Sequence, residues 1–124
     1  MSLVARRLEA EGLPTVVAGS ARDIVEQAGA PRFLFTDFPL GNPMGKPDDL
    51  PMQRAVLGMA LDLLQNATMP RTTVQTPFVW NDDHRWRQNF MRVDDSNRAQ
   101  LAAAGEARKA KQELAKQDGR ARKI

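Results

Sequence analysis

Two short apolar runs place the strongest constraint on the fold of this chain. The first, Leu13–Ala18, has Thr and Val at its centre, and the second, Arg32–Thr36, contains three consecutive large apolar residues. Both runs are apolar on both sides, which is typical of strands buried in a parallel sheet. The segment between them, Ala21–Gln27, is predicted to be a short helix with Ser20 as its N-cap. Two strands joined by a helix form a βαβ unit, so we expect them to be parallel.

Four further helices are predicted, and one of them is unusual. The segment Asp48–Asn66 is apolar except for a narrow polar stripe beyond its first turn, so we expect it to be covered nearly all round. It would then lie deep in the domain or against another subunit. The other predicted helices are Ser2–Ala10, His84–Arg92 and Arg98–Gln117.

We therefore predict an α/β fold: a Rossmann-like βαβ unit with parallel strands, a long buried helix, and an extended plus helical C-terminal arm. The expected segments are an α/β core unit (residues 1–66), an extended docking arm (67–97) and a basic C-terminal helix (98–124). Thr72–Trp80 has the composition of a strand, but Pro77 interrupts it, so an arm on the surface is favoured over a pairing edge strand.

Two strands are too few for a stable parallel sheet, although both look built for complete burial. Three alternatives would supply the missing cover: homo-oligomerisation, a separate partner chain, or a longer parent protein of which this sequence is a part.

Charge and cysteine content limit the classes of function. Residues 1–97 contain ten Lys/Arg and twelve Asp/Glu, a net charge of −2, whereas residues 98–124 contain eight and three, a net charge of +5. A basic tail can bind nucleic acid, but this one lacks aromatic residues for base stacking, and nucleic acid is not expected as a partner.

The absence of cysteine excludes thiol nucleophiles and disulfides. With neither a secretory signal nor an apolar stretch that could span a bilayer, the chain is expected in the cytoplasm and not in a membrane.

The loop after the second run is the predicted functional region. Pro31–Pro47 contains four of the eight prolines and two of the eight glycines, so the loop should have a defined shape. In α/β proteins, ligands usually bind at the carboxyl ends of parallel strands. The candidate ligand-binding residues at this edge are Ser20, Asp37, Pro39, Gly41 and Asn42.

Each polar candidate has a plainer alternative. The hydroxyl of Ser20 could bind a carboxylate or phosphate, or it could only cap the following helix. Asp37 could hold a substrate ammonium group or orient a thiol of a partner, or it could only fix the loop through the backbone, and Asn42 has similar alternatives. His84 stands alone beside carboxylates, which is a poor ligand set, so no metal site and no cofactor are predicted.

Four segments resemble a known family: LVARRLEAEGLPTVV (Leu3–Val17), SARDI (Ser20–Ile24), PRFLFTDFPLGNPMGKP (Pro31–Pro47) and QRAVLGMALDLL (Gln53–Leu64). They are similar to the C-terminal portion of the B-type (selenoprotein B-like) proteins of the glycine/sarcosine/betaine/D-proline reductase family. The resemblance implies reductive cleavage of a C–N bond in an amino-acid-like substrate by a selenol or thiol, with other subunits completing the enzyme. In that family the reactive residue lies just upstream of the helix that begins here at Ser2, so no catalytic residue is carried over.

The resemblance suggests a function with two alternatives. The leading hypothesis is a non-selenocysteine member or subunit of such an oxidoreductase, acting in a homo- or hetero-oligomer with polypeptide that supplies the thiol or selenol. The second is a small interaction or scaffold subunit that docks through its apolar helix and basic tail. The third is a module that binds a small amino-acid-like ligand through Ser20, Asp37 and Asn42.

Overall fold

The computed structural model describes residues 1–90 and 92–117. The chain divides into two units, Met1–Phe90 and the remainder, and each is described by itself. The first unit contains a three-stranded sheet and the helices α1 (Ser2–Ala10), α2 (Arg22–Gln27), α3 (Leu50–Asn66) and α4 (Arg85–Asn89). Among the described residues, no helix combines the length and the apolar character needed to cross a bilayer.

All three strands of the sheet are parallel, and the order is β1 (Val17–Gly19), β2 (Arg32–Phe35), β3 (Thr72–Gln75). The mixed α/β class and the parallel pairing of the first two strands are thus confirmed. The prediction that residues 72–80 form an extended surface arm is wrong for Thr72–Gln75, which pair with β2 as the strand β3. Its β-branched residues precede Pro77, so the proline follows the ladder and interrupts no hydrogen bond of the sheet.

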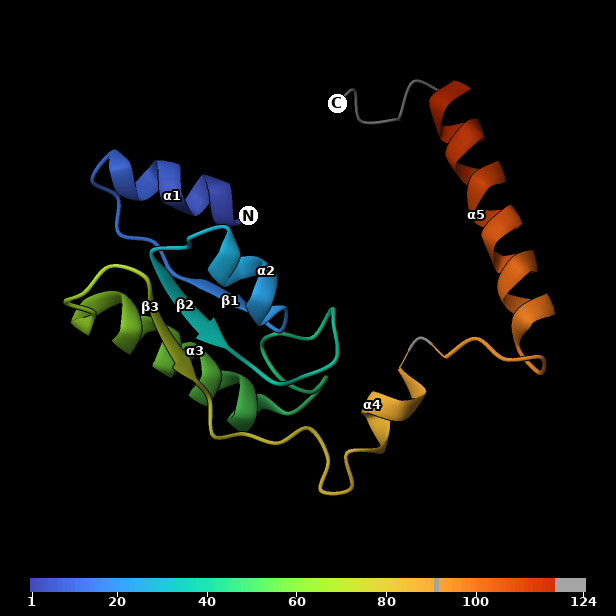
Figure 1. Ribbon diagram of the computed structural model, residues 1–124. Coiled ribbons are helices and arrows are strands. Elements are labelled where there is room, and N and C mark those ends of the chain that lie inside the picture. Colours follow the sequence, from blue (N-terminus) through green and yellow to red (C-terminus); the bar gives the residue numbers. More distant parts are fainter. Residues whose placement is uncertain (91, 118–124) are drawn as a thin grey trace. The chain divides into compact units, whose positions relative to one another are not determined.

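Neighbouring residues of β2 face opposite sides of the sheet, and each side is covered by a different helix. Phe33 packs with Val25 of α2, whereas Leu34 packs with residues of α3. The chain therefore turns to one face after β1 and to the other after β2 (Figure 1). The carboxyl ends of the three strands remain together at one edge, where the loop after β2 begins.

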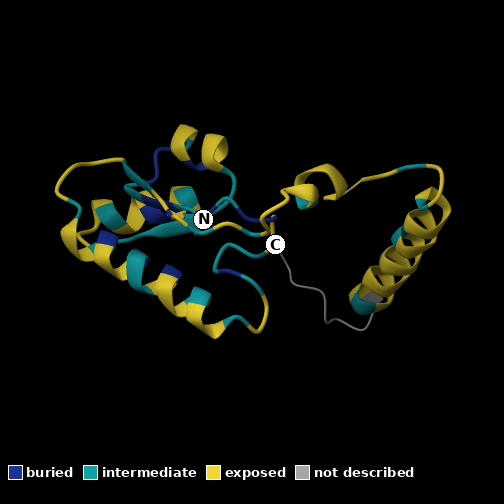
Figure 2. Cartoon of the chain, turned by 90° about the horizontal axis from the view of Figure 1, so that it is seen from below, coloured by how far each residue is buried: buried dark blue, intermediate teal, exposed yellow. Residues whose placement is uncertain are grey.

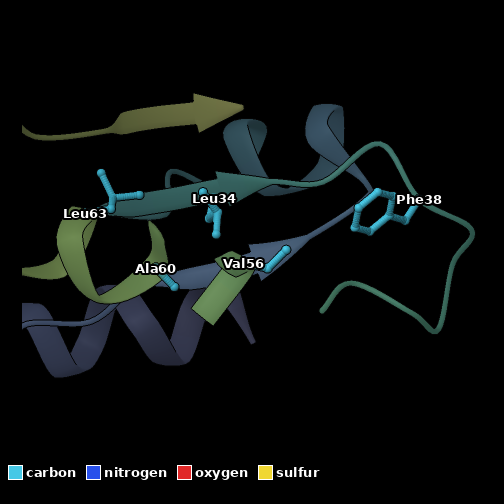
Figure 3. Packing of buried hydrophobic residues seen from close by; sticks show 5 residues of the cluster. All are labelled: Leu34, Phe38, Val56, Ala60 and Leu63. Carbon is cyan, nitrogen blue, oxygen red and sulfur yellow. The ribbon is translucent and has the colours of Figure 1, made fainter. Parts of the chain in front are cut away.

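The main core lies between β2, α3 and the loop. Figure 3 shows its five buried residues, with Val56 and Ala60 of α3 facing Leu34. Phe38 lies at the loop end of this cluster and is 2% exposed. Phe38 also packs against Trp80, with ring centroids 5.6 Å apart. The start of the loop is therefore anchored to the core by a buried aromatic side chain.

The described chain does not bury α3 all round. Its outward side is exposed (Figure 2), and Leu50, Leu57 and Leu61 are 58%, 49% and 55% exposed. The expectation that this helix lies deep in the domain is wrong, because the sheet covers only one of its faces. The alternative that it packs against another subunit remains a prediction.

The second unit contains α5 (Arg98–Gln117), which has the predicted bounds and no buried residue among those described. The predicted helix at residues 84–92 is shorter in the structure, where it is α4. Its residue 91 and residues 118–124 of the basic tail lie outside the described residues. The division into segments 1–66, 67–97 and 98–124 remains a prediction.

Candidate ligand site at the carboxyl edge of the sheet

Thr36 fixes the entry of the loop at the end of β2. Its side chain is completely buried, and its hydroxyl donates a hydrogen bond of 2.9 Å to the carbonyl oxygen of Pro43. This bond connects the residue after β2 to Pro43 and so closes the first half of the loop. A buried hydroxyl is costly to leave without a partner, so the bond favours one shape of the loop.

Two turns complete the loop. The N–H of Asn42 donates to the carbonyl of Pro39 at 3.1 Å, and the N–H of Gly45 donates to the carbonyl of Asn42 at 3.3 Å. Gly41 and Gly45 have φ values of +98° and +114°, which side chains other than glycine rarely allow. The expectation of a loop with turns set by glycine and proline agrees with this geometry.

Ser20 is not the N-cap of α2. The N-cap position belongs to Ala21, which makes no side-chain capping bond. The hydroxyl of Ser20 lies instead 3.5 Å from that of Thr36. Ser20 therefore follows β1 as predicted and lies beside the residue that follows β2, but the capping alternative is wrong.

Asp37 is paired with a residue that the sequence did not indicate. Its carboxylate accepts a hydrogen bond from the guanidinium of Arg87 on α4. Nη1 of Arg87 also lies 2.8 Å from Nδ1 of His84. Because a guanidinium can only donate, Nδ1 must accept, which places the proton of a neutral His84 ring on Nε2. His84 itself has a left-handed backbone with φ of +53°, a conformation that is unusual for a side-chain-bearing residue.

These residues line a cavity of about 170 Å³ at the carboxyl ends of β2 and β3. One of its walls is Thr76, which is 3% exposed and whose hydroxyl has no hydrogen-bond partner among the described residues. Such an unpaired buried hydroxyl is rare in folded proteins. The lining residues are Asp37, Gln75, Thr76, Pro77, Phe78, Val79, Trp80, His84 and Arg87.

The cavity combines a cation, an anion, the polar side chains of Gln75, Thr76 and His84, and apolar walls. Arg87, the hydroxyl of Thr76 and Nε2–H of His84 can donate hydrogen bonds, and Asp37 can accept them. This set suits a small molecule that carries both an acidic and a basic group. No set of three or more His, Cys, Asp or Glu side chains is grouped like metal ligands within residues 1–90 and 92–117.

The other candidates from the sequence lie outside this cavity. Pro39 is buried, Gly41 is exposed and Asn42 is half-buried, and none of the three lines it. Sequence reasoning missed Thr76 and Arg87, and it considered His84 only as a metal ligand. Thr76 could have been found, because it follows β3 as Asp37 follows β2, once the segment before Pro77 is accepted as a strand.

The comparisons with known proteins give one distant relative. No family model matches the chain, and no solved structure matches it. D-proline reductase subunit gamma from Acetoanaerobium sticklandii is 29% identical over 78 residues, which are 63% of this chain and 32% of that protein. The match thus spans about a third of the length of the relative. It supports a distant relation to that reductase family.

Proposed function

We propose that this chain is a non-selenocysteine member or subunit of a glycine/betaine/D-proline reductase-like oxidoreductase. The observation that carries the proposal is the likeness to a D-proline reductase subunit. The finer resemblance to the C-terminal portion of B-type proteins, and a Rossmann-like arrangement of the sheet, belong to the same proposal.

The chain acts with additional polypeptide in this proposal. Reductive cleavage of a C–N bond requires two electrons, and a sequence without cysteine has no thiol to supply them. A pair of thiols, or a selenol and a thiol, of another polypeptide therefore delivers the two electrons and is oxidised to a disulfide or selenenyl sulfide, while the carbon and the nitrogen of the cleaved bond each take up one proton. The residues of this chain bind and orient the substrate at the carboxyl edge of the sheet.

The cavity beside Asp37 is the proposed binding site for an amino-acid-like ligand. In this proposal Arg87 and His84 bind a carboxylate, and Asp37 binds an ammonium group. Because Arg87 and Asp37 pair with each other in the structure, a zwitterion would bind by taking over both partners. Ser20, Pro39, Gly41 and Asn42 remain proposed as the surrounding binding edge.

Ligand-induced stabilisation tests the site. Glycine, betaine and D-proline are titrated against the full chain while the unfolding temperature is recorded. A ligand at about 100 times its dissociation constant adds roughly 2.7 kcal/mol of stability. We expect Asp37→Asn to abolish the shift, whereas Asp95→Asn, a matched change at an exposed carboxylate of the second unit, leaves it intact. Equal shifts of the unfolding temperature in both variants would show that the ligand does not bind beside Asp37.

Reconstitution tests the function. The isolated chain, supplied with dithiothreitol, is expected to reduce none of the three substrates. Addition of reductase subunits that carry a selenol or thiol is expected to give activity and a complex that sediments as one species. Thiol-dependent reduction by a stable monomer of this chain alone would overturn the proposal.

The alternative function is an interaction or scaffold subunit that docks through its apolar helix and basic tail. The exposed leucines of α3 favour it. Deletion of residues 98–124 separates the two proposals, since salt-sensitive binding to a larger complex would be lost with the tail, whereas ligand binding beside Asp37 would persist.

A further inference from the structure

Helix α3 has a row of exposed leucines that the sheet does not cover. The row, here called the leucine stripe, consists of Leu50, Leu57, Leu61 and Leu64, at spacings of seven, four and three residues. Three of its members are about half exposed, and the fourth is partly buried. Steps of three and four residues are the spacing at which one helix packs along another.

Gly58 lies beside the leucine stripe, in the middle of the helix. A Cβ added at this position would have no atom of the described chain within 4 Å. Glycine in a helix interior costs about 1 kcal/mol relative to alanine, and packing within the described chain does not require it. Glycine does allow a second backbone to come close, so Gly58 marks a place where another helix can approach.

The charges around Gly58 are arranged symmetrically. Arg54 precedes it by four residues and Asp62 follows it by four. Both side chains are exposed, and neither forms an ion pair with any residue that the structure describes. If a second α3 lies antiparallel with a twofold axis beside Gly58, Arg54 of each copy is opposite Asp62 of the other. A twofold interface must be complementary to itself in this way.

We propose that the leucine stripe is covered by α3 of a second copy of this chain. The two helices pack antiparallel through Leu57 and Leu61, cross closely at Gly58, and form two ion pairs between Arg54 and Asp62. The pairing does not depend on the proposed reductase function. Interfaces that bury less than roughly 1,200 Å² are typical of weak or transient complexes, so dimerisation through one helix face is expected to depend on protein concentration.

Charge reversal tests the identity of the partner. Sedimentation velocity of the full chain is measured over a series of concentrations, with circular dichroism to verify folding. The wild type is expected to form a dimer as the concentration rises. Asp62→Arg and Arg54→Asp, each placing like charges opposite each other, should weaken dimerisation by about tenfold or more, since like charges that face each other across an interface repel. The double variant R54D/D62R should restore it.

The double variant distinguishes a second copy from a different protein, because only a self-complementary interface is repaired when both charges are exchanged within one chain. A wild type that stays monomeric at every concentration, single variants that dimerise normally, or a double variant that fails to recover would each overturn the proposal.

Glycine substitution provides an independent test with a matched control. Gly58→Ala should weaken dimerisation while it raises the helix propensity of α3. Gly105→Ala makes the same change in α5, at a glycine that also has no atom within 4 Å of an added Cβ. It should leave the dimerisation constant unchanged. If both variants dimerise like the wild type, α3 helices do not cross at Gly58, and the proposed geometry is wrong.

Discussion

Single side chains at the carboxyl edge of the sheet hold together segments that the sequence separates. Thr36 joins the end of β2 to Pro43 through its hydroxyl and lies beside Ser20, which follows β1. A threonine is needed here because its methyl group packs in a buried environment while its hydroxyl donates a hydrogen bond. The site therefore depends on a residue that itself lies outside the cavity.

Thr36→Val should destabilise the chain by about 1–3 kcal/mol, because the substitution keeps the shape but leaves the carbonyl of Pro43 without its donor. Urea unfolding measures the effect. Thr68→Val, at an exposed position, serves as the control and should change stability little. A Thr36 variant as stable as the wild type would show that the loop does not need this bond.

Glu9 makes stability depend on pH in the acidic range. Burial opposes its ionisation, but hydrogen bonds from Arg32 and from the N–H of Thr15, together with the charge of Arg32, outweigh burial and hold the pKa of Glu9 below its ordinary value of 4.5. The unfolded carboxyl thus takes up its proton at higher pH than the folded one. The stability from this pair is complete above about pH 4.5 and is lost as the pH falls through the lowered pKa.

Glu9→Gln should therefore reduce stability at neutral pH and flatten its decline between pH 5 and pH 3. Urea midpoints measured across this range provide the test. Glu113→Gln on α5, where the carboxylate is exposed, should keep the slope of the wild type. An unchanged slope in the Glu9 variant would contradict a role for this pair.

At the scale of elements, local patterns predicted most helices and β2, but not what covers them. The first strand was expected at Leu13–Ala18, whereas β1 spans Val17–Gly19 and shares only two residues with that run. The bounds of α1 and α5 follow from apolar spacing and helix propensity. The prediction of a surface arm fails at β3 because Pro77 affects only the residues after Gln75 and leaves Thr72–Gln75 free to pair. The exposure of Leu57 and Leu61 could not be predicted, since periodicity shows that a face is apolar and not which surface meets it.

The loop after β2 offers a test of its predicted shape. In Gly45→Ala the new Cβ would lie 3.1 Å from Cγ of Met52 and would have to adopt φ of +114°. Gly41→Ala imposes a similar φ of +98° but meets no atom within 4 Å. The backbone conformation alone costs about 1–2 kcal/mol, so the Gly45 variant should lose more stability in urea unfolding than the Gly41 variant. Equal losses would mean that contact with Met52 is unimportant.

At the scale of the whole molecule, the site could be predicted only in part. The carboxyl edge and Asp37 follow from the order of strands and loops. The pairing of Asp37 with Arg87 joins positions fifty residues apart, and no local pattern indicates such a contact. The same holds for Thr76, whose unpaired hydroxyl becomes visible only when β3 is placed beside β2.

The distribution of buried residues predicts which part of the chain is needed for stability. Every buried residue of the described chain lies between Ala5 and Thr76, and α5 contributes none. Removal of residues 98–124 should therefore change the free energy of unfolding by less than about 1 kcal/mol, which corresponds to a midpoint shift of less than roughly 4–8 °C for a chain of this size. The deletion also changes the net charge from +3 to −2, so thermal unfolding is compared at high salt, where exposed charges are screened. A larger loss of stability would show that the C-terminal helix stabilises the core, and the basic tail would then be a structural element and not only a candidate docking segment.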